Sequence, residues 1–244
     1  MGTATRLRQL LIGVATPAMI GGLLVASGVA SEASPTTSVR VQSIMAGASA
    51  KVDTRLATLD RLATTVRSSA SLSSSDKAYL SDEISNEISG LSGLQTKLAA
   101  DTNVAQASAD ADSVLSGYRV YTLVVPKVRL VSMADHQQHV EATLRSRAQT
   151  LQSMITADTS AGTDVSSEQT ALDKVLSQIS IAEWFSASLE NRVLLLQPSD
   201  WNAHHDTLTG DRAALITLHA QNLSSASKLD SIARLLQLVP HGKK

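Results

Sequence analysis

The sequence predicts an all-α protein: an elongated, antiparallel helical bundle with coiled-coil-like packing and four to five long helices. Apolar residues recur at steps of three and four along most of the chain, and no segment alternates with a period of two. Aromatic residues are scarce, with two Trp, three Tyr and one Phe, and the abundant Ala, Leu, Ile and Val suit closely packed helices. Heptad-like spacing in several segments favours coiled-coil packing.

The first thirty residues predict export. Arg6 and Arg8 precede an uncharged run from Leu10 to Ala30, and Gly28 and Ala30 are small residues of the kind found before a signal-peptidase cut. This pattern is that of a secretory signal peptide cleaved after Ala30. The run of 21 residues is also long enough to cross a bilayer, so retention as an uncleaved anchor is the alternative. We expect a secreted or extracytoplasmic protein that meets the membrane only through residues 10–30, if they are retained.

The remaining chain is expected to form a linker over residues 31–37, a helical bundle domain over residues 38–240 and a basic tail over residues 241–244. Removing residues 1–30 lowers the basic residues from 21 to 19 against 22 acidic ones, which leaves a net charge near −3. This balance offers no basic surface for nucleic acid, so no such partner is expected. The chain has no cysteine, which excludes thiol catalysis, disulfides and thiolate metal sites.

The first helix is predicted from one apolar seam that spans about 30 residues. The members of the seam are Val41, Met45, Ala48, Val52, Leu56, Leu59, Ala63, Val66 and Ala70. Serines after Leu72 break this helix and cap a second one, with Asp76 in its first turn. The stripe of the second helix is Leu80, Ile84, Ile88, Leu91, Leu94 and Leu98. Gly90 and Gly93 weaken this helix in the middle.

A joint at Asp101 leads into a third helical stretch over residues 104–123. Val125 then precedes Pro126, and a residue before proline is pushed away from the helical region. The chain is therefore predicted to kink or turn at Pro126.

A further long helix is predicted to end at Asp158. Residues 165–169 read as a capping box that opens the next helix, which Pro198 closes. Ser199 and Asp200 are expected to cap the last helix, which runs towards Pro240.

Residues 72–135 carry a series of short motifs. They are the LSxxD cap, the ISGL-x-x-L stripe, the K-x-A-x-DT joint, and YRVY followed by VPK. This block is similar to one in uncharacterised secreted helical proteins of actinobacteria and related Gram-positive lineages. The similarity is close over about a quarter of the chain. The C-terminal helices share only the general helical pattern. The resemblance implies export and a helical fold, and it implies no activity.

The segment YRVYTLVVP is the most distinctive local motif. Tyr118 and Tyr121 are three residues apart, which predicts that they share a helix face. One interpretation is a contact patch for a partner, with Arg119 and Arg129 on its rim. The other is that the two rings seal the core beside Pro126, with hydroxyls reaching carbonyls that the proline leaves unpaired. The second is favoured, because helically spaced aromatic residues are usually core residues.

Four histidines form the candidate metal site. His136 and His139 are an i, i+3 pair on one helix, and His204 and His205 lie near the start of the last helix. If the two helices run parallel, the pairs lie within a few turns of each other and, with a carboxylate, make a site for zinc, copper or nickel. The alternative is that they are exposed polar residues at helix ends, because no HExxH or comparable signature is present.

Catalysis is not expected. No G-x-S-x-G elbow or phosphate-binding glycine loop occurs, and carboxylate pairs such as Asp82 with Glu83 are assigned to solvated helix faces. The leading hypothesis is an exported, non-catalytic helical bundle of the cell envelope or extracellular space, with a structural or protein-interaction role towards a partner or itself. The alternative is a small-ligand or metal-binding bundle that uses the clustered histidines. No other cofactor is expected.

Overall fold

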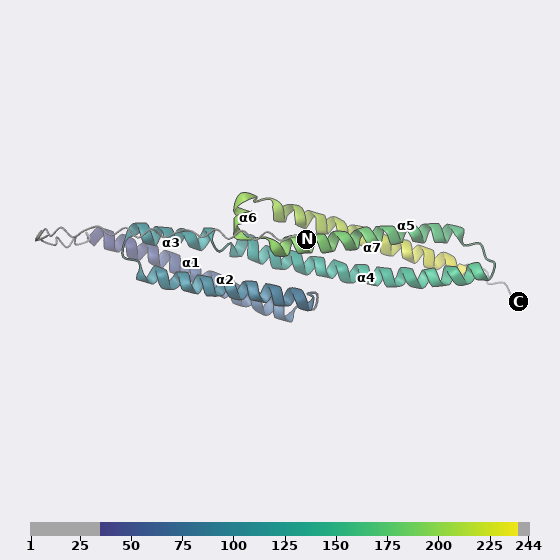
Figure 1. Ribbon diagram of the computed structural model, residues 1–244, viewed down its shortest axis with the longest axis horizontal. Coiled ribbons are helices and arrows are strands. Elements are labelled where there is room, and N and C mark those ends of the chain that lie inside the picture. The colour runs from purple at the N-terminus through teal and green to yellow at the C-terminus, as the bar shows by residue number, and fades with distance from the viewer. Residues whose placement is uncertain (1–34, 239–244) are drawn as a thin grey trace, which may run out of the picture. The chain divides into compact units, whose positions relative to one another are not determined.

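The computed structural model describes residues 35–238, which belong to one compact unit of the chain. Every regular element in this range is a helix (Figure 1). The elements are α1 (Pro35–Ser68), α2 (Ser74–Ala100), α3 (Val104–Ser116), the π-helix η1 (Val120–Val124), α4 (Val125–Ser160), α5 (Ser166–Leu195), α6 (Pro198–Ala203) and α7 (Thr207–Leu238). The described residues confirm the all-α fold, with α1, α2, α4, α5 and α7 as its long helices.

Several sequence predictions lie outside the described residues. They concern the signal peptide or anchor, its cut after Ala30, residues 31–34 of the linker and the basic tail. Helix α1 begins at Pro35, so residues 35–37 of the predicted linker form a helical first turn. Proline is tolerated there because the first N–H groups of a helix have no partner within it. Within residues 35–238, no helix has an apolar stretch sufficient to span a bilayer.

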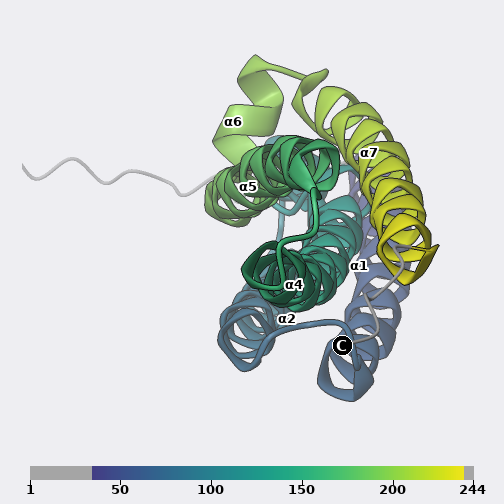
Figure 2. The same cartoon turned by 90° about the vertical axis from the view of Figure 1, so that its right-hand side faces the viewer.

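Helices α4, α5 and α7 pack together as a three-helix bundle, seen along its length in Figure 2. Between α4 and α5 the residue numbers of successive polar pairs increase along one helix and decrease along the other, so these helices are antiparallel. Between α4 and α7 the residue numbers of successive pairs increase along both helices, so these helices are parallel. The pairs are Arg145 with Glu183 and Gln152 with Gln169, and Gln137 with His219 and Arg147 with Asp230.

Helices α1 and α2 form an antiparallel hairpin, and α3 packs mainly on α1. We call the first two the α1–α2 hairpin. The end of this hairpin meets α4, where the Ser71 and Ser132 hydroxyls lie 2.9 Å apart and the Ser73 N–H donates to Asp135 Oδ2 at 2.8 Å. The hairpin is therefore attached to the three-helix bundle at its turn.

The core consists of two apolar clusters separated by a polar layer. One cluster joins α1, α2, α3, η1 and the first part of α4, as far as Ala134, with the second half of α5 and the first part of α7. The other begins at Leu144 on α4 and continues between α5 and α7. The polar layer between them contains the buried residues Gln137, Glu141, Ser186, Asn222 and Ser225. Apolar burial stabilises each cluster, whereas the polar layer restricts which residues of the three helices meet.

The first half of the chain follows its sequence pattern. Val41, Ala48, Val52, Leu59 and Val66 of the predicted seam are all buried. The predicted cap of α2 is also confirmed. The Asp76 N–H donates to the Ser73 hydroxyl at 3.1 Å, and that hydroxyl donates to Asp76 Oδ2 at 2.7 Å. The sequence is sufficient to predict this cap because Ser73 and Asp76 are only three residues apart.

The prediction that Val125 leaves the helical region before Pro126 is wrong. Val125 has helical angles, φ −63° and ψ −48°, and η1 continues directly into α4. The chain departs from the helix earlier, where Gly117 ends α3 and Arg119 has ψ 48°. A π turn precedes Pro126, with the Val125 N–H bonded to the carbonyl five residues back. This local change of pairing accommodates the proline, which lies in the first turn of α4.

The two later caps also differ from prediction. No capping box forms at the start of α5; instead Asp164 Oδ1 accepts from the Ser166 N–H at 3.1 Å and from its hydroxyl at 2.8 Å. A carboxylate satisfies the free N–H groups and suits the positive end of the helix. Asp200 caps the short helix α6, where its Oδ2 accepts from the Gln197 N–H at 2.8 Å. The last long helix begins only at Thr207.

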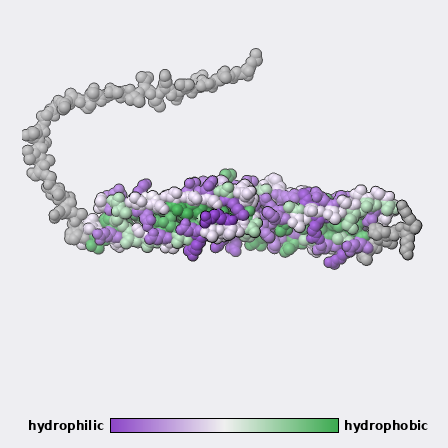
Figure 3. Space-filling model, turned by 90° about the horizontal axis from the view of Figure 1, so that it is seen from below, coloured by the Kyte–Doolittle hydropathy of each residue, from purple (hydrophilic) through white to green (hydrophobic). Residues whose placement is uncertain are grey.

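The outer surface contains both hydrophilic and apolar residues. Figure 3 shows a face on which hydrophilic residues predominate and apolar residues lie between them. Several large apolar side chains are nevertheless exposed, with Trp184 and Leu195 at 70% and 69% of their full exposure and Ile181 at 63%. All three lie on α5, which makes this helix a candidate for contacts outside the chain.

Candidate functional site

The α5–α7 groove is a set of hollows that follow one another between these two helices. Their volumes are about 300, 190 and 390 Å³. Ile181 and Gln221 line both of the first two, and Gln178 and Lys228 line both of the last two, so the hollows are continuous. From Ser167 to Phe185 the groove extends along α5 for about 27 Å, from the rise of an α-helix.

The lining of the α5–α7 groove is apolar with a positive charge. Its apolar residues are Ala171, Val175, Ile181, Ala182, Phe185, Ala214, Leu218, Ile232 and Leu235. Its charged residues are Lys174 and Lys228, and no acidic side chain lines the hollows. The ammonium of Lys228 donates to Gln178 Oε1 at 3.0 Å, which holds it at the groove. A long apolar channel with cationic edges matches the face of an amphipathic, acidic helix.

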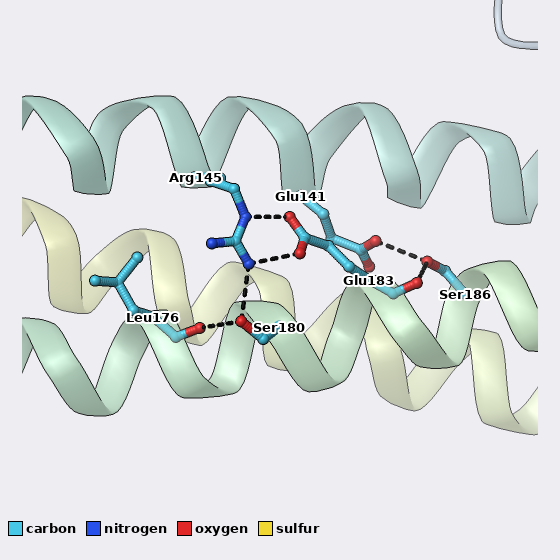
Figure 4. A network of polar contacts seen from close by, with 6 residues as sticks. All are labelled: Glu141, Arg145, Leu176, Ser180, Glu183 and Ser186. Carbon is cyan, nitrogen blue, oxygen red and sulfur yellow. Dashed lines mark hydrogen bonds and ion pairs between the residues drawn. The ribbon is translucent and has the colours of Figure 1, made fainter.

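The polar layer lies beside this groove. Glu141 is fully buried and accepts from the Ser186 hydroxyl at 2.7 Å and from Asn222 Nδ2 at 3.0 Å. Burial raises the pKa of Glu141, and these two hydrogen bonds oppose that rise. Figure 4 shows Glu141 and Ser186 next to the ion pair in which Arg145 contacts Glu183 at 2.5 Å. The layer holds α4, α5 and α7 in one register.

A second polar region, which we call the acidic seam, joins α2 to α4 and α5. Its members are Asp76, Glu83, Glu87, Lys127, Asp135 and Glu190. Lys127 is completely buried. Its ammonium donates hydrogen bonds to Glu83 Oε1 at 2.6 Å and to the carbonyls of Leu196 at 2.6 Å and Leu194 at 3.2 Å. These carbonyls lie at the negative C-terminal end of α5, which favours a cation.

Lys127 does not satisfy every carboxylate near it. Glu83 Oε2 and Glu87 Oε2 are buried and have no hydrogen-bond partner. Burial and the charge of Glu83 raise the pKa of Glu87 to about 7, although Lys127 opposes the rise. Glu87 is therefore partly protonated near neutral pH.

Three other acids of the seam meet at its far end. Oxygens of Asp76, Asp135 and Glu190 lie within 4.8 Å of one another. Burial, followed by the hydrogen bond and charge of Asp76, raises the pKa of Glu190 to about 8. Burial also raises the pKa of Asp135. Buried carboxylates at this spacing repel one another, which favours the protonated forms of Glu190 and Asp135, and we assign no metal to the group.

The structure does not bring the four predicted histidines together. His136 and His139 lie on the part of α4 that faces His219 of α7, whereas His204 and His205 precede the first residue of α7. The helices do run parallel, but this register separates the pairs by about four turns. The His205 ring packs on Trp201, with centroids 5.3 Å apart, and His139 Nδ1 lies 3.1 Å from the Asp135 carbonyl.

The two tyrosines do not share a helix face, because Tyr118 lies in the non-helical residues before η1 and Tyr121 lies within η1. Tyr118 precedes η1 and packs against Gly90 of α2, so it is a half-buried neighbour of the core. Tyr121 is exposed, its hydroxyl donates to the Thr54 carbonyl at 3.3 Å, and the Arg55 guanidinium lies 5.3 Å from its ring centroid. Neither hydroxyl contact corresponds to a carbonyl freed by the proline.

The two arginines predicted for the rim of this patch point elsewhere. Arg119 Nε donates to Asn202 Oδ1 at 2.9 Å, which links η1 to α6. Arg129 lines an open hollow of about 590 Å³ that also contains His136 and His219. The two tyrosines and two arginines therefore do not form one contact patch in the structure.

The acidic seam was not predicted from the sequence. Glu83 was expected on a solvated face, whereas it is the ion-pair partner of Lys127. A signal was present in the run VVPKVRLV, because a lysine within an apolar run is often buried with a partner. The identity of that partner depends on which helices meet, and local spacing contains no such information.

Comparison of the chain with family models, curated proteins and solved structures finds no match. The resemblance of residues 72–135 to secreted helical proteins therefore stays a prediction.

Proposed function

We propose that this protein is an exported, non-catalytic helical bundle that binds a protein partner through the α5–α7 groove. The pattern of residues 1–30 supports export. The groove is the observation that supports binding, because it combines exposed apolar residues with a length of about 18 helical residues. The occupant is an amphipathic helix with acidic residues beside its apolar stripe.

The choice of a helix follows from the packing of α4, α5 and α7. A groove between two packed helices can accept a further helix, with side chains interlocking as in coiled coils, and the α5–α7 groove is of this kind. The choice of acidic flanks follows from Lys174 and Lys228. Two copies that met through this groove would bring the same lysines towards each other, which disfavours self-association.

The test uses a synthetic peptide of 21 residues with leucine at heptad positions a and d and glutamate at e and g. A second peptide has lysine in place of glutamate. We expect calorimetric titration of the protein to give a Kd on the order of 10 µM for the acidic peptide, with weaker binding at high salt. The basic peptide should bind at least about tenfold more weakly.

Variants locate the binding surface. Ile181→Asp introduces a charge on a side chain that is 63% exposed, so it should fold normally and reduce affinity at least about tenfold. Lys228→Glu should reverse the preference between the peptides. The control is Leu115→Asp, which changes an exposed apolar residue of α3 away from the groove. Equal binding of the two peptides, an Ile181→Asp variant with full affinity, or a dimer that Ile181→Asp dissociates would overturn the proposal.

A further inference from the structure

The acidic seam has more acidic groups than its basic partner can balance. Asp76, Glu83 and Glu87 lie on α2, Asp135 on α4 and Glu190 on α5, and Lys127 is the ammonium among them. Desolvated carboxylates repel one another, so the folded arrangement favours carboxyl groups that keep their protons. The attachment of α2 to the three-helix bundle is therefore linked to proton binding.

The seam is also the place where the α1–α2 hairpin is attached. Helices α1 and α2 pack mostly on each other, while α4 packs mostly on α5 and α7. Side chains of the seam connect the two groups, through Lys127 with Glu83 and through Asp76 with Asp135 and Glu190. Leu80 of α2 lies between these two contacts along the helix, and Ile84 directly follows Glu83; each is 1% exposed. Movement of α2 away from α4 and α5 would expose this apolar surface.

We propose that the acidic seam is a pH-sensitive latch, which holds the α1–α2 hairpin on α4 and α5 while Glu87 and Glu190 keep their protons and loosens when these protons are lost. Every neighbouring element contributes titratable groups. Glu190 faces Asp76 of α2 and Asp135 of α4. It accepts a hydrogen bond from Gln138, and His139 lies next to Asp135. Glu87 faces Glu83, Lys127 and the Tyr118 hydroxyl. Tyr79, beside Glu83, donates to the Leu194 carbonyl.

The direction of the pH effect follows from linkage. A carboxyl group whose pKa is higher in the closed form binds protons more tightly there, so its stabilising effect is complete at low pH and is lost as pH rises through the raised pKa. The pKa is about 7 for Glu87 and about 8 for Glu190, against 4.5 for a free glutamate. Between pH 6 and pH 9 the opening equilibrium should rise about tenfold from Glu87 and by at most about a hundredfold from Glu190.

Hydrogen exchange measures this opening directly. The protein is prepared with a chelator, so that no divalent cation replaces the protons, and exchange of residues 76–87 is followed at pH 6, 7, 8 and 9. Rates are corrected for the intrinsic effect of pH. We expect protection of residues 76–87 to fall by at least tenfold across this range, while protection in the α4–α5 contact around residues 144–155 stays constant.

Conservative variants identify the groups responsible. Glu190→Gln and Glu87→Gln should each flatten the pH dependence, and the pair together should abolish it. The control Asp82→Asn changes an exposed carboxylate on the same helix and should leave the wild-type profile. Glu87→Gln is an independent test if Glu190→Gln alters the fold. Protection of residues 76–87 that does not change with pH, or a pH dependence that survives both glutamine substitutions, would overturn the latch.

Discussion

Two glycines of α2 allow a sharp test of the packing between α2 and the segment before η1. Gly90 and Gly93 lie three residues apart in the same helix, and the low helix propensity of glycine predicts that both destabilise it. A Cβ atom at Gly90 would lie 2.6 Å from Cε1 and 2.7 Å from the hydroxyl oxygen of Tyr118. A Cβ atom at Gly93 would meet nothing within 4 Å. The same substitution should therefore have opposite effects at the two positions.

The magnitudes follow from helix propensity and steric overlap. Alanine in place of glycine stabilises a helix interior by about 1 kcal/mol, and this is the whole effect expected for Gly93→Ala. At Gly90 the Tyr118 ring must shift by almost 1 Å to reach normal contact, and overpacking of this kind costs about 1–3 kcal/mol. Gly90→Ala should then be destabilising by about 1 kcal/mol, which separates the two variants by about 2 kcal/mol.

Urea unfolding followed by circular dichroism measures both free energies of unfolding. In thermal unfolding the same difference separates the two midpoints by roughly 4–8 °C for a chain of this size. Repeating Gly90→Ala in a Tyr118→Leu background removes the ring, and the substitution should then become stabilising. If Gly90→Ala and Gly93→Ala are equally stabilising in the wild-type chain, the packing of Tyr118 on Gly90 is refuted.

Two more predictions concern buried charges. Lys127→Met leaves Glu83 and two carbonyls without their cation, and should lower the free energy of unfolding by about 3–5 kcal/mol in urea titration at pH 7. Adding Glu83→Gln should recover part of this loss, and a double variant no more stable than Lys127→Met would contradict the pairing. Glu141→Gln should gain stability relative to wild type as pH rises above about 4.5, because burial raises the pKa of Glu141 and the stability linked to its proton is lost at higher pH. Equal unfolding free energies of wild type and Glu141→Gln from pH 4 to pH 8 would show that this carboxyl group does not titrate differently on folding.

The sequence allowed prediction of most of the helices and little of the sites. The seam of α1 and the Ser73 cap were predictable because their members lie within a few residues of one another. The prediction of a non-helical Val125 was wrong because the π turn of η1 depends on backbone pairing that the local preference of a residue before proline does not describe. The histidine pairs were expected to approach each other only if their two helices ran parallel, and exposed polar residues were the alternative. The helices are parallel, but their register keeps the pairs apart.

Sequence alone determined that this chain is all-α, because the 3.6-residue period of the helix decides which side chains share a face. It predicts export in the same way, through a local pattern. The tertiary structure decided which faces meet. Only there does Lys127 meet Glu83, Asp76 meet Glu190, and an apolar groove with two lysines open between α5 and α7. The physical reason is that burial and charge depend on neighbours 40 to 115 residues away, which no local period records.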